Sequence, residues 1–260
     1  MRSSGLPMTH PRSRPAAGAA MVEFTIIALP LLFLACAAFE TGRWMLARQA
    51  VGYALFETAR VGTVAGADPA AMAEAFERAL APALGVDGQA DPGALAEAVG
   101  KKMQAWADAH GMPMARIEQL NPIPASFDDF PDVPARTGQA RQLDHDHLRL
   151  RHDTVYLSRY RNGVGPRSGQ TVFQANTLVL RLTYLHAPYW PVMRALLRQL
   201  AGADERDAYV RRAREAGLVV IRKDIAMPMQ SAAREHGHAA DLLAARSKVG
   251  KARLSAVPAR

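Results

Sequence analysis

Residues 19–39 read AAMVEFTIIALPLLFLACAAF, an almost wholly apolar run with one charge, Glu23. An α-helix rises about 1.5 Å per residue, so this run would span roughly 32 Å, close to the hydrocarbon thickness of a bilayer. Large apolar residues would cover every face of that helix: Leu29, Leu31, Leu32, Phe33 and Leu34. This distribution suits lipid better than a buried helix in a soluble protein. The run therefore predicts a membrane span.

The charges on either side of the run predict its orientation. Residues 1–18 contain three arginines and no acid, whereas two arginines and Glu40 follow the run closely. The excess of basic residues places the N-terminus in the cytoplasm and residues 43–260 on the other side of the membrane. A cleaved secretory signal is the alternative, because residues 35–38 are small, as signal peptidase requires.

A helical pattern continues beyond the apolar run. Apolar and small residues recur at alternating spacings of three and four, at Trp44, Ala47, Val51, Ala54, Thr58, Val61 and Ala65. No turn signal interrupts the chain before Gly66, so we predict one helix from about Ala19 to Val64. Its second half would pack on the exported domain. Pro30 removes one backbone hydrogen bond and is expected to kink the span.

The remaining sequence predicts a small mixed domain. Helices are expected near residues 70–84, 92–109 and 188–200, and strands at residues 115–120, 154–159 and 178–184. Residues 218–222 and 225–229 are expected to form one further strand or a pair of strands. We therefore expect an α+β fold, in which a long N-terminal transmembrane helix continues into an exported domain of short helices and an antiparallel sheet. This domain would occupy residues 66–234. Residues 235–260 lose hydrophobic periodicity and are predicted to form a disordered tail.

The composition narrows the classes of partner. The chain has 260 residues and a net charge of +8, which favours anionic partners such as membrane surfaces, acidic polysaccharide or nucleic acid. Aromatic residues are sparse near the basic stretch at residues 206–214, which argues against a nucleic-acid stacking platform. The single cysteine, Cys36, lies in the apolar run and cannot form an intramolecular disulfide.

One short stretch is a candidate metal site. In Asp144-His145-Asp146-His147, the two histidines would share one face of a strand within reach of one ion. The alternative is an exposed polar strand edge, which the nearby Arg149 favours. The sequence has no recognisable nucleophile motif and no glycine-rich phosphate loop. We therefore expect no cofactor, no metal and no enzymatic activity.

Glu23 is the one charged residue of the apolar run, and its presence there needs an explanation. A carboxylate inside an apolar helix is costly and usually functional. Glu23 stands five residues after Gly18 and is followed by Phe24. This arrangement resembles type IV prepilins, whose basic leader ends in glycine before an apolar helix with Glu at the fifth mature position.

The prepilin resemblance implies cleavage between Gly18 and Ala19. Glu23 would then neutralise the new amino terminus of a neighbouring subunit, a charge pair that is strongest at low dielectric. The alternative is that Glu23 marks the end of the span at the lipid headgroups.

The surrounding motifs narrow the class further. Gly18–Phe24, Leu29–Leu32, Glu40–Arg43 and Ala47–Ala50 together are similar to the N-terminal module of the TadE-like family. Such proteins are minor pilins or pseudopilins of tight-adherence (Tad) type IV pilus systems, and they often carry Tyr where Phe24 stands here. Weaker similarity continues at Gln119–Pro122, Asp146–Arg149, Gln174–Leu178 and Met229–Ser231.

The TadE-like resemblance implies a place and a set of partners. It implies a single-pass inner-membrane protein with a basic leader at residues 1–18, a pilin-like helix at residues 19–65, and a domain in the periplasm or on the pilus. Its partners would be other Tad pilins or pseudopilins, inner-membrane assembly proteins and a prepilin peptidase, and its role would lie in cell adhesion. One alternative is an uncleaved single-pass protein whose periplasmic domain binds a partner or a polysaccharide. Another is an exported metal-dependent enzyme.

Overall fold

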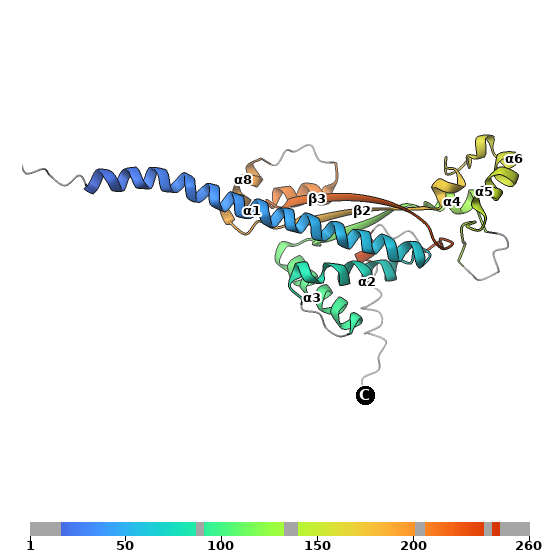
Figure 1. Ribbon diagram of the computed structural model, residues 1–260, viewed down its shortest axis with the longest axis horizontal. Helices are drawn as coiled ribbons and strands as arrows, with labels where there is room; N and C mark the ends of the chain where they lie inside the picture. The colour runs from blue at the N-terminus through green and yellow to red at the C-terminus, as the bar shows by residue number, and fades with distance from the viewer. Residues whose placement is uncertain (1–16, 87–90, 133–139, 201–205, 237–240, 245–260) are drawn as a thin grey trace, which may run out of the picture. The chain divides into compact units, whose positions relative to one another are not determined.

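A computed structural model describes residues 17–86, 91–132, 140–200, 206–236 and 241–244 (Figure 1). The chain divides into two compact units, residues 1–43 and residues 44–260. Of the predicted leader, residues 1–16 lie outside the described residues.

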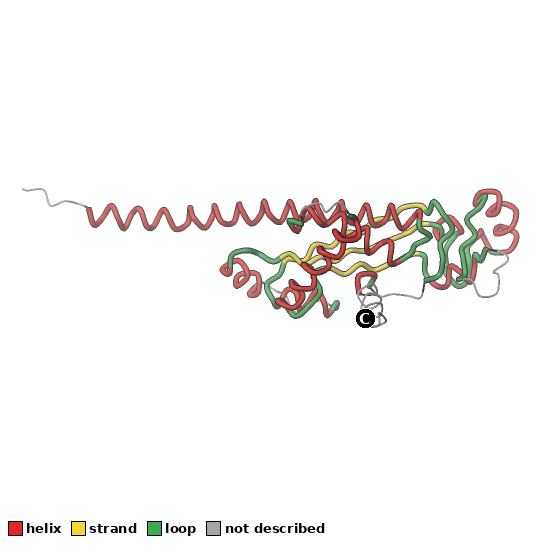
Figure 2. The backbone as a smooth tube through the Cα atoms, turned by 90° about the horizontal axis from the view of Figure 1, so that it is seen from below, coloured by secondary structure: helices red, strands yellow, loops and turns green. Residues whose placement is uncertain are grey.

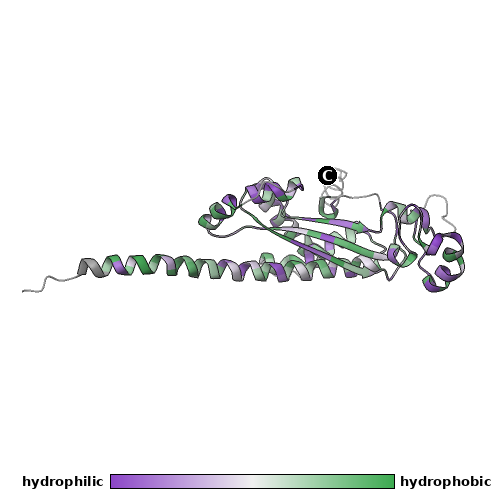
Figure 3. Cartoon of the chain, turned by 90° about the horizontal axis from the view of Figure 1, so that it is seen from above, coloured by the Kyte–Doolittle hydropathy of each residue, from purple (hydrophilic) through white to green (hydrophobic). Residues whose placement is uncertain are grey.

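Helix α1, Ala17–Val64, is one continuous element that runs through Pro30. Its stretch Met21–Val64 is long and apolar enough to cross a membrane. In the first unit the large apolar side chains are exposed, as lipid-facing side chains would be; Phe24 is 73% exposed and Leu29 63%. Figure 3 shows this part of α1 mostly in the colour of hydrophobic residues. The long N-terminal apolar helix predicted from the sequence is therefore confirmed.

The second unit is built on a three-stranded antiparallel sheet. Its order is β1 (Ala115–Asn121), β2 (Thr177–His186), β3 (Val219–Pro228). The alternation predicted for residues 178–184 is confirmed, because Leu178, Leu180 and Leu182 are all fully buried in the same core as Leu55 of α1. The α+β class is confirmed as well.

One strand prediction left two alternatives open, and another was wrong. Residues 218–222 and 225–229, expected as one further strand or a pair, form one strand, since Lys223 and Asp224 continue the ladder opposite Leu182 and Arg181. Residues 154–159, whose Thr154 and Val155 suggested a strand, are helical instead. They belong to a π-helical turn, η2 (His152–Tyr156), and to α6 (Leu157–Arg159). The helical turn buries Tyr156 against Phe130, with ring centroids 4.9 Å apart.

The second half of α1 covers one face of the sheet together with α2 (Pro69–Leu80), which lies beside it in Figures 1 and 2. Asp68 begins α2 by accepting a hydrogen bond from the Ala70 amide at 3.0 Å, and Pro69 fits the first turn. A short 3₁₀ turn, η1 (Ala81–Leu84), and α3 (Pro92–His110) follow. Met72, Phe76 and Leu80 of α2 complete the core.

The other face of the sheet is more polar. Arg181 donates to both carboxylate oxygens of Asp224, at 2.9 and 2.6 Å. Near one end, α9 (Ala208–Glu215) covers this face, and its Ala213 packs with Leu185 and Leu218. The amphipathic helix expected at residues 188–200 is α8 (Pro191–Gln199).

The described residues between β1 and β2, 122–132 and 140–176, form a lobe of short helices beyond one end of the sheet (Figure 1). The lobe contains α4 (Pro124–Asp129), α5 (Leu148–Arg151), η2, α6, η3 (Arg161–Gly163) and α7 (Val172–Ala175).

Part of the expected C-terminal tail is packed. Leu242 is 1% exposed and belongs to the main core, and the Asp241 carboxylate accepts a hydrogen bond from the Ile117 amide at 3.2 Å. The predicted disordered segment therefore includes a docked piece at residues 241–244. Residues 237–240 and 245–260 lie outside the described residues.

Candidate assembly surface

The residues predicted for processing and assembly lie at the start of α1. Gly18 and Ala19 belong to its first turn, and Glu23 and Phe24 follow in the next. The side chains of Glu23 and Phe24 are exposed. Glu23 forms no ion pair with any other residue that the structure describes, so its carboxylate is open to a group from another molecule.

A second acid of α1 lies at the end of the predicted span. Glu40 is only 6% exposed, and its Oε1 lies 3.4 Å from a guanidinium nitrogen of Arg43. The spacing of three places these two side chains on one side of the helix. The motif Glu40–Arg43, noted above for its resemblance, therefore forms a local ion pair.

Within the second unit, one side of α1 is buried in the domain. Val51, Ala54, Leu55, Thr58 and Ala59 are each 2% exposed or less. The Thr58 hydroxyl donates to the Ala54 carbonyl at 2.7 Å, so this buried polar group is satisfied. The stripe predicted from the sequence contains Val51, Ala54 and Thr58, which lie at the centre of this buried face. It missed Leu55 and Ala59, because a buried helix face is wider than one line of residues at spacings of three and four.

The opposite side of the same helix is exposed and largely apolar. The exposed fractions are 52% for Met45, 68% for Leu46, 59% for Tyr53, 44% for Phe56 and 59% for Val64. At about 100° of helix rotation per residue, these five residues fall within roughly 100° of one another, so they form one stripe, which we call the outer stripe. Exposed Gln49 and Arg60 lie on the same side of the helix. An apolar stripe of this kind is a surface that another helix can cover.

Distant stretches of sequence meet where α1 ends. The Ser231 hydroxyl donates to the Thr63 carbonyl at 3.1 Å and accepts from the Gly66 amide at 3.0 Å. The Gln230 amide also donates to the Thr63 carbonyl, at 3.0 Å. These bonds fasten the residues after β3 to the last turn of α1 and satisfy a terminal helix carbonyl.

The lobe joins the sheet through two buried asparagines. Asn121 donates from Nδ2 to the Gln174 carbonyl at 2.8 Å, and Asn176 donates to the Asp144 carbonyl at 2.8 Å. The Asn176 carbonyl accepts from the Met229 amide at 2.8 Å. Three of the four stretches with weaker similarity, around residues 121, 176 and 230, therefore share one hydrogen-bonded joint. Sequence reasoning identified the stretches but not their proximity.

The metal candidates do not share a strand face. His145 is half-buried, with Nδ1 3.3 Å from Oδ1 of Asn176. His147 is exposed and has a φ of 52°, at the turn that begins α5. The strand-edge interpretation of residues 144–147 is wrong, because this turn breaks the extended backbone. In the part of the chain that the structure describes, no group of three or more His, Cys, Asp or Glu side chains could hold a metal ion.

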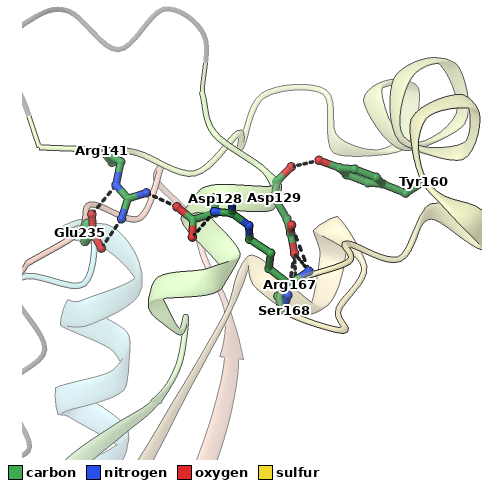
Figure 4. Close-up of polar contacts among 7 residues, drawn as sticks. All are labelled: Asp128, Asp129, Arg141, Tyr160, Arg167, Ser168 and Glu235. Carbon is green, nitrogen blue, oxygen red and sulfur yellow. Dashed lines mark hydrogen bonds and ion pairs between the residues drawn. The ribbon is translucent and has the colours of Figure 1, made fainter.

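The lobe is held by two neighbouring carboxylates with different roles (Figure 4). Exposed Asp128 forms ion pairs with Arg141 and with Arg167, and Arg141 in turn binds Glu235 at 2.6 Å. Hydrogen bonds from Arg141 and then Arg167 lower the pKa of Asp128. Buried Asp129 accepts from the Ser168 amide and hydroxyl, both at 2.7 Å.

A third carboxylate of the lobe is buried. Asp144 is 3% exposed and accepts from the Tyr156 hydroxyl at 2.6 Å and from Arg151 Nε at 2.7 Å. Burial, and then the hydrogen bond to Asp144, raise the pKa of Tyr156 above its usual value. The polar groups of the lobe thus satisfy one another and serve its structure.

Comparison with protein families bears on α1. A family model described as TadE-like protein matches residues 18–60. These residues, less than a fifth of the chain, are similar to that family, and we call them the TadE-like segment. The match begins at the predicted processing site, includes Glu23 and Phe24, and ends within the helix turns that carry the outer stripe. No curated protein and no solved structure matches the chain. The TadE-like segment supports, in general terms, a component associated with the Tad pilus and its membrane machinery.

Proposed function

We propose that this TadE-like chain is a minor pilin or pseudopilin of Tad pilus assembly. The first part of α1 anchors it in the inner membrane, and the second unit lies in the periplasm or on the pilus. Its role is structural and not enzymatic. Its partners are other Tad pilins or pseudopilins and inner-membrane assembly proteins.

The outer stripe carries this proposal. A helix that only tethered a domain would need apolar residues in the bilayer and on the face that packs on the sheet. Here α1 also presents Met45, Tyr53 and Phe56 to the outside, on the opposite side from its buried face. Exposed apolar area of this kind is typical of surfaces that bind another protein. Because it lies on the same helix as the TadE-like match, we infer that neighbouring pilin helices cover it.

Processing is the second part of the proposal. A prepilin peptidase on the cytoplasmic side cuts between Gly18 and Ala19, and Glu23 then pairs with the free amine of an adjacent subunit. The exposed carboxylate of Glu23 and its position in the TadE-like match support this role.

The test combines N-terminal analysis with crosslinking in cells. Mass spectrometry of the mature protein should find Ala19 as its first residue. A photoreactive amino acid at Tyr53 should capture other pilin subunits, whereas one at Arg48, which is exposed but lies off the outer stripe, should not. An intact leader in cells with active peptidase would favour the uncleaved alternative, whose periplasmic domain binds a partner or a polysaccharide. Equal crosslinking at both positions would contradict packing through the outer stripe.

A further inference from the structure

Helix α8 presents an exposed apolar face of its own. Val192 is 64% exposed, Leu196 40% and Leu200 70%. Their spacing of four residues places them along one side of the helix. Tyr189 and Trp190, directly before the helix, are 68% and 39% exposed. Five large apolar or aromatic side chains thus gather in the short surface segment 189–200, which consists of α8 and the residues at its two ends.

The other side of α8 is fixed to the domain. Arg194 donates from Nε to the Pro188 carbonyl at 3.2 Å, and its NH2 group lies 3.3 Å from Nε2 of His110. Gly217 lies under the helix, because a Cβ built on it would clash with the Arg194 carbonyl oxygen. Arg194 is roughly half a turn away from Val192 and Leu196. The packing therefore holds the apolar side of α8 outward.

The position of α8 within the second unit suggests what it meets. A Cβ built on Gly52 of α1 would lie 3.1 Å from Lys223 Nζ of β3, so the end of this side chain reaches α1 at Gly52. Gly62 meets Leu178, which pairs with Met227, so β3 runs along α1 in the same direction. Four residues before Lys223, Val219 pairs with His186. Four strand residues cover about 13 Å, which equals eight or nine residues of helix. His186 therefore lies about level with Trp44, where the chain enters this unit from the apolar segment.

Helix α8 begins five residues after His186 and so lies at this same end of the sheet. Figures 1 and 2 both show it at the opposite end of the sheet from the lobe that contains α4, α5 and α6.

The chemistry of this segment fits a lipid surface. Residues 186–200 contain Arg194 and Arg198 and no acid. Tyr and Trp are enriched at membrane interfaces, and helices that lie in the headgroup region combine an apolar face with basic residues. We propose that α8 lies on the membrane in which α1 is anchored, with Val192, Leu196 and Leu200 at the acyl boundary and Tyr189 and Trp190 at the headgroup level. The proposal requires the membrane anchor and goes beyond the pilus role.

A depth measurement on the full chain tests this proposal. In a Cys36→Ser background reconstituted in nanodiscs, Leu196→Cys carries an environment-sensitive fluorophore. Leu150→Cys in α5, where the native leucine is 62% exposed, is the matched control. Brominated phosphatidylglycerol should quench the label at position 196 and leave the label at position 150 unquenched, while aqueous iodide should do the reverse. Unchanged thermal unfolding of both proteins confirms that the labels leave the fold intact.

Two outcomes would contradict the membrane position of α8. Equal iodide quenching at positions 196 and 150 would overturn the proposal. Protection of position 196 that requires two chains per disc and occurs without bromolipid quenching would also overturn it, by assigning the face to a second copy.

Discussion

Gly62 of α1 lies so close to Leu178 of β2 that a Cβ on the glycine would stand 2.8 Å from the leucine Cδ2. Met72 Sδ of α2 would be 2.5 Å from the same position. No ordinary Cβ contact is that short, so the glycine allows α1, α2 and the sheet to meet at this point.

We predict that Gly62→Ala destabilises the domain. Overpacking costs about 1–3 kcal/mol, which exceeds the roughly 1 kcal/mol that alanine gains over glycine in a helix. Gly52→Ala is the matched control, because its Cβ would meet only the mobile end of Lys223. Thermal unfolding in the same detergent should rank the two variants on opposite sides of wild type. An increase in unfolding temperature for Gly62→Ala would contradict this account.

Asp129 and Asp128 should differ sharply when each is replaced by alanine. Asp129→Ala leaves the Arg167 amide and both polar groups of Ser168 without their acceptor, and we expect a loss of about 3 kcal/mol in unfolding free energy. Asp128 is exposed, so its ion pairs are screened by water and its removal should change stability little. Hydrogen exchange at the Arg167 and Ser168 amides should accelerate only in Asp129→Ala. Similar losses in both variants would show that the exposed ion pairs hold the lobe.

The stability contributed by Asp241 should depend on pH. Burial raises the pKa of this carboxyl, although backbone amides including those of Ile117 and Leu243 lower it in part. A group with a raised pKa in the folded chain favours the fold below its unfolded pKa, near 3.9, and this contribution is lost as pH rises through the folded pKa. Asp241→Asn avoids burying a charge. Its stability relative to wild type should therefore increase as pH rises above about 4.

The hydrogen-bond geometry supplies the control for this experiment. The Ile117 and Leu243 amides both donate to Oδ1 of Asp241, so an asparagine can keep both bonds. Asp241→Ala loses both and should cost about 1–3 kcal/mol. Chemical unfolding at several pH values measures these differences. A constant difference between Asp241→Asn and wild type across that range would refute the pH dependence.

The two faces of α1 should respond differently to a charge. Phe56→Glu places a carboxylate on the outer stripe, where the side chain is 44% exposed, so the isolated protein should fold normally but assemble poorly. Ala54→Glu buries the same charge in the core and should prevent folding. Pilus formation and thermal unfolding of purified protein are measured side by side. Normal piliation by Phe56→Glu, in cells where deletion of the chain abolishes pili, would exclude the outer stripe as an assembly surface.

Processing and packing should separate at the start of α1. Gly18→Val should block trimming by crowding the scissile bond. Glu23→Ala should be trimmed normally yet assemble poorly, because an uncompensated amine in a low-dielectric bundle costs about 3–5 kcal/mol when fully buried. A processing blot and a pilus assay of the same cells distinguish the two, with deletion of the chain as control. Full piliation by Glu23→Ala, where deletion abolishes it, would show that Glu23 only marks the membrane boundary.

The elements predicted best were those with strong local patterns. The length of the apolar run around Leu29 predicted α1, because a helix with one kind of surroundings is apolar on every face. The alternation from Leu178 to Tyr184 predicted β2, because alternate residues of a strand point to the same face. The lobe was predicted poorly. Thr154 and Val155 favour strands, but the local preference is overridden where Tyr156 reaches Asp144 from a helical turn.

The joint at the end of α1 depends on distant residues. Thr63 and Ser231 are 168 positions apart in sequence, and no local sequence pattern predicts their hydrogen bond. The docking of Leu242 was missed for the same reason, since one buried leucine in a polar segment carries no periodicity. The outer stripe was not recognised because apolar residues on both sides of a helix near a membrane span look like a continuation of that span.

The packing of Leu242 affects the order in which the protein can be made. Ile117 receives its hydrogen-bond acceptor from Asp241, 124 residues later in the chain, and Leu242 belongs to the main core. Ribosomes add roughly 5–20 residues per second, so the 124 residues that separate Ile117 from Asp241 take about 6–25 s to synthesise. During that time the edge of β1 at Ile117 is uncovered. Chains that terminate early would keep an open core and become substrates for proteases. Quality control can thus remove incomplete copies before any assembly step.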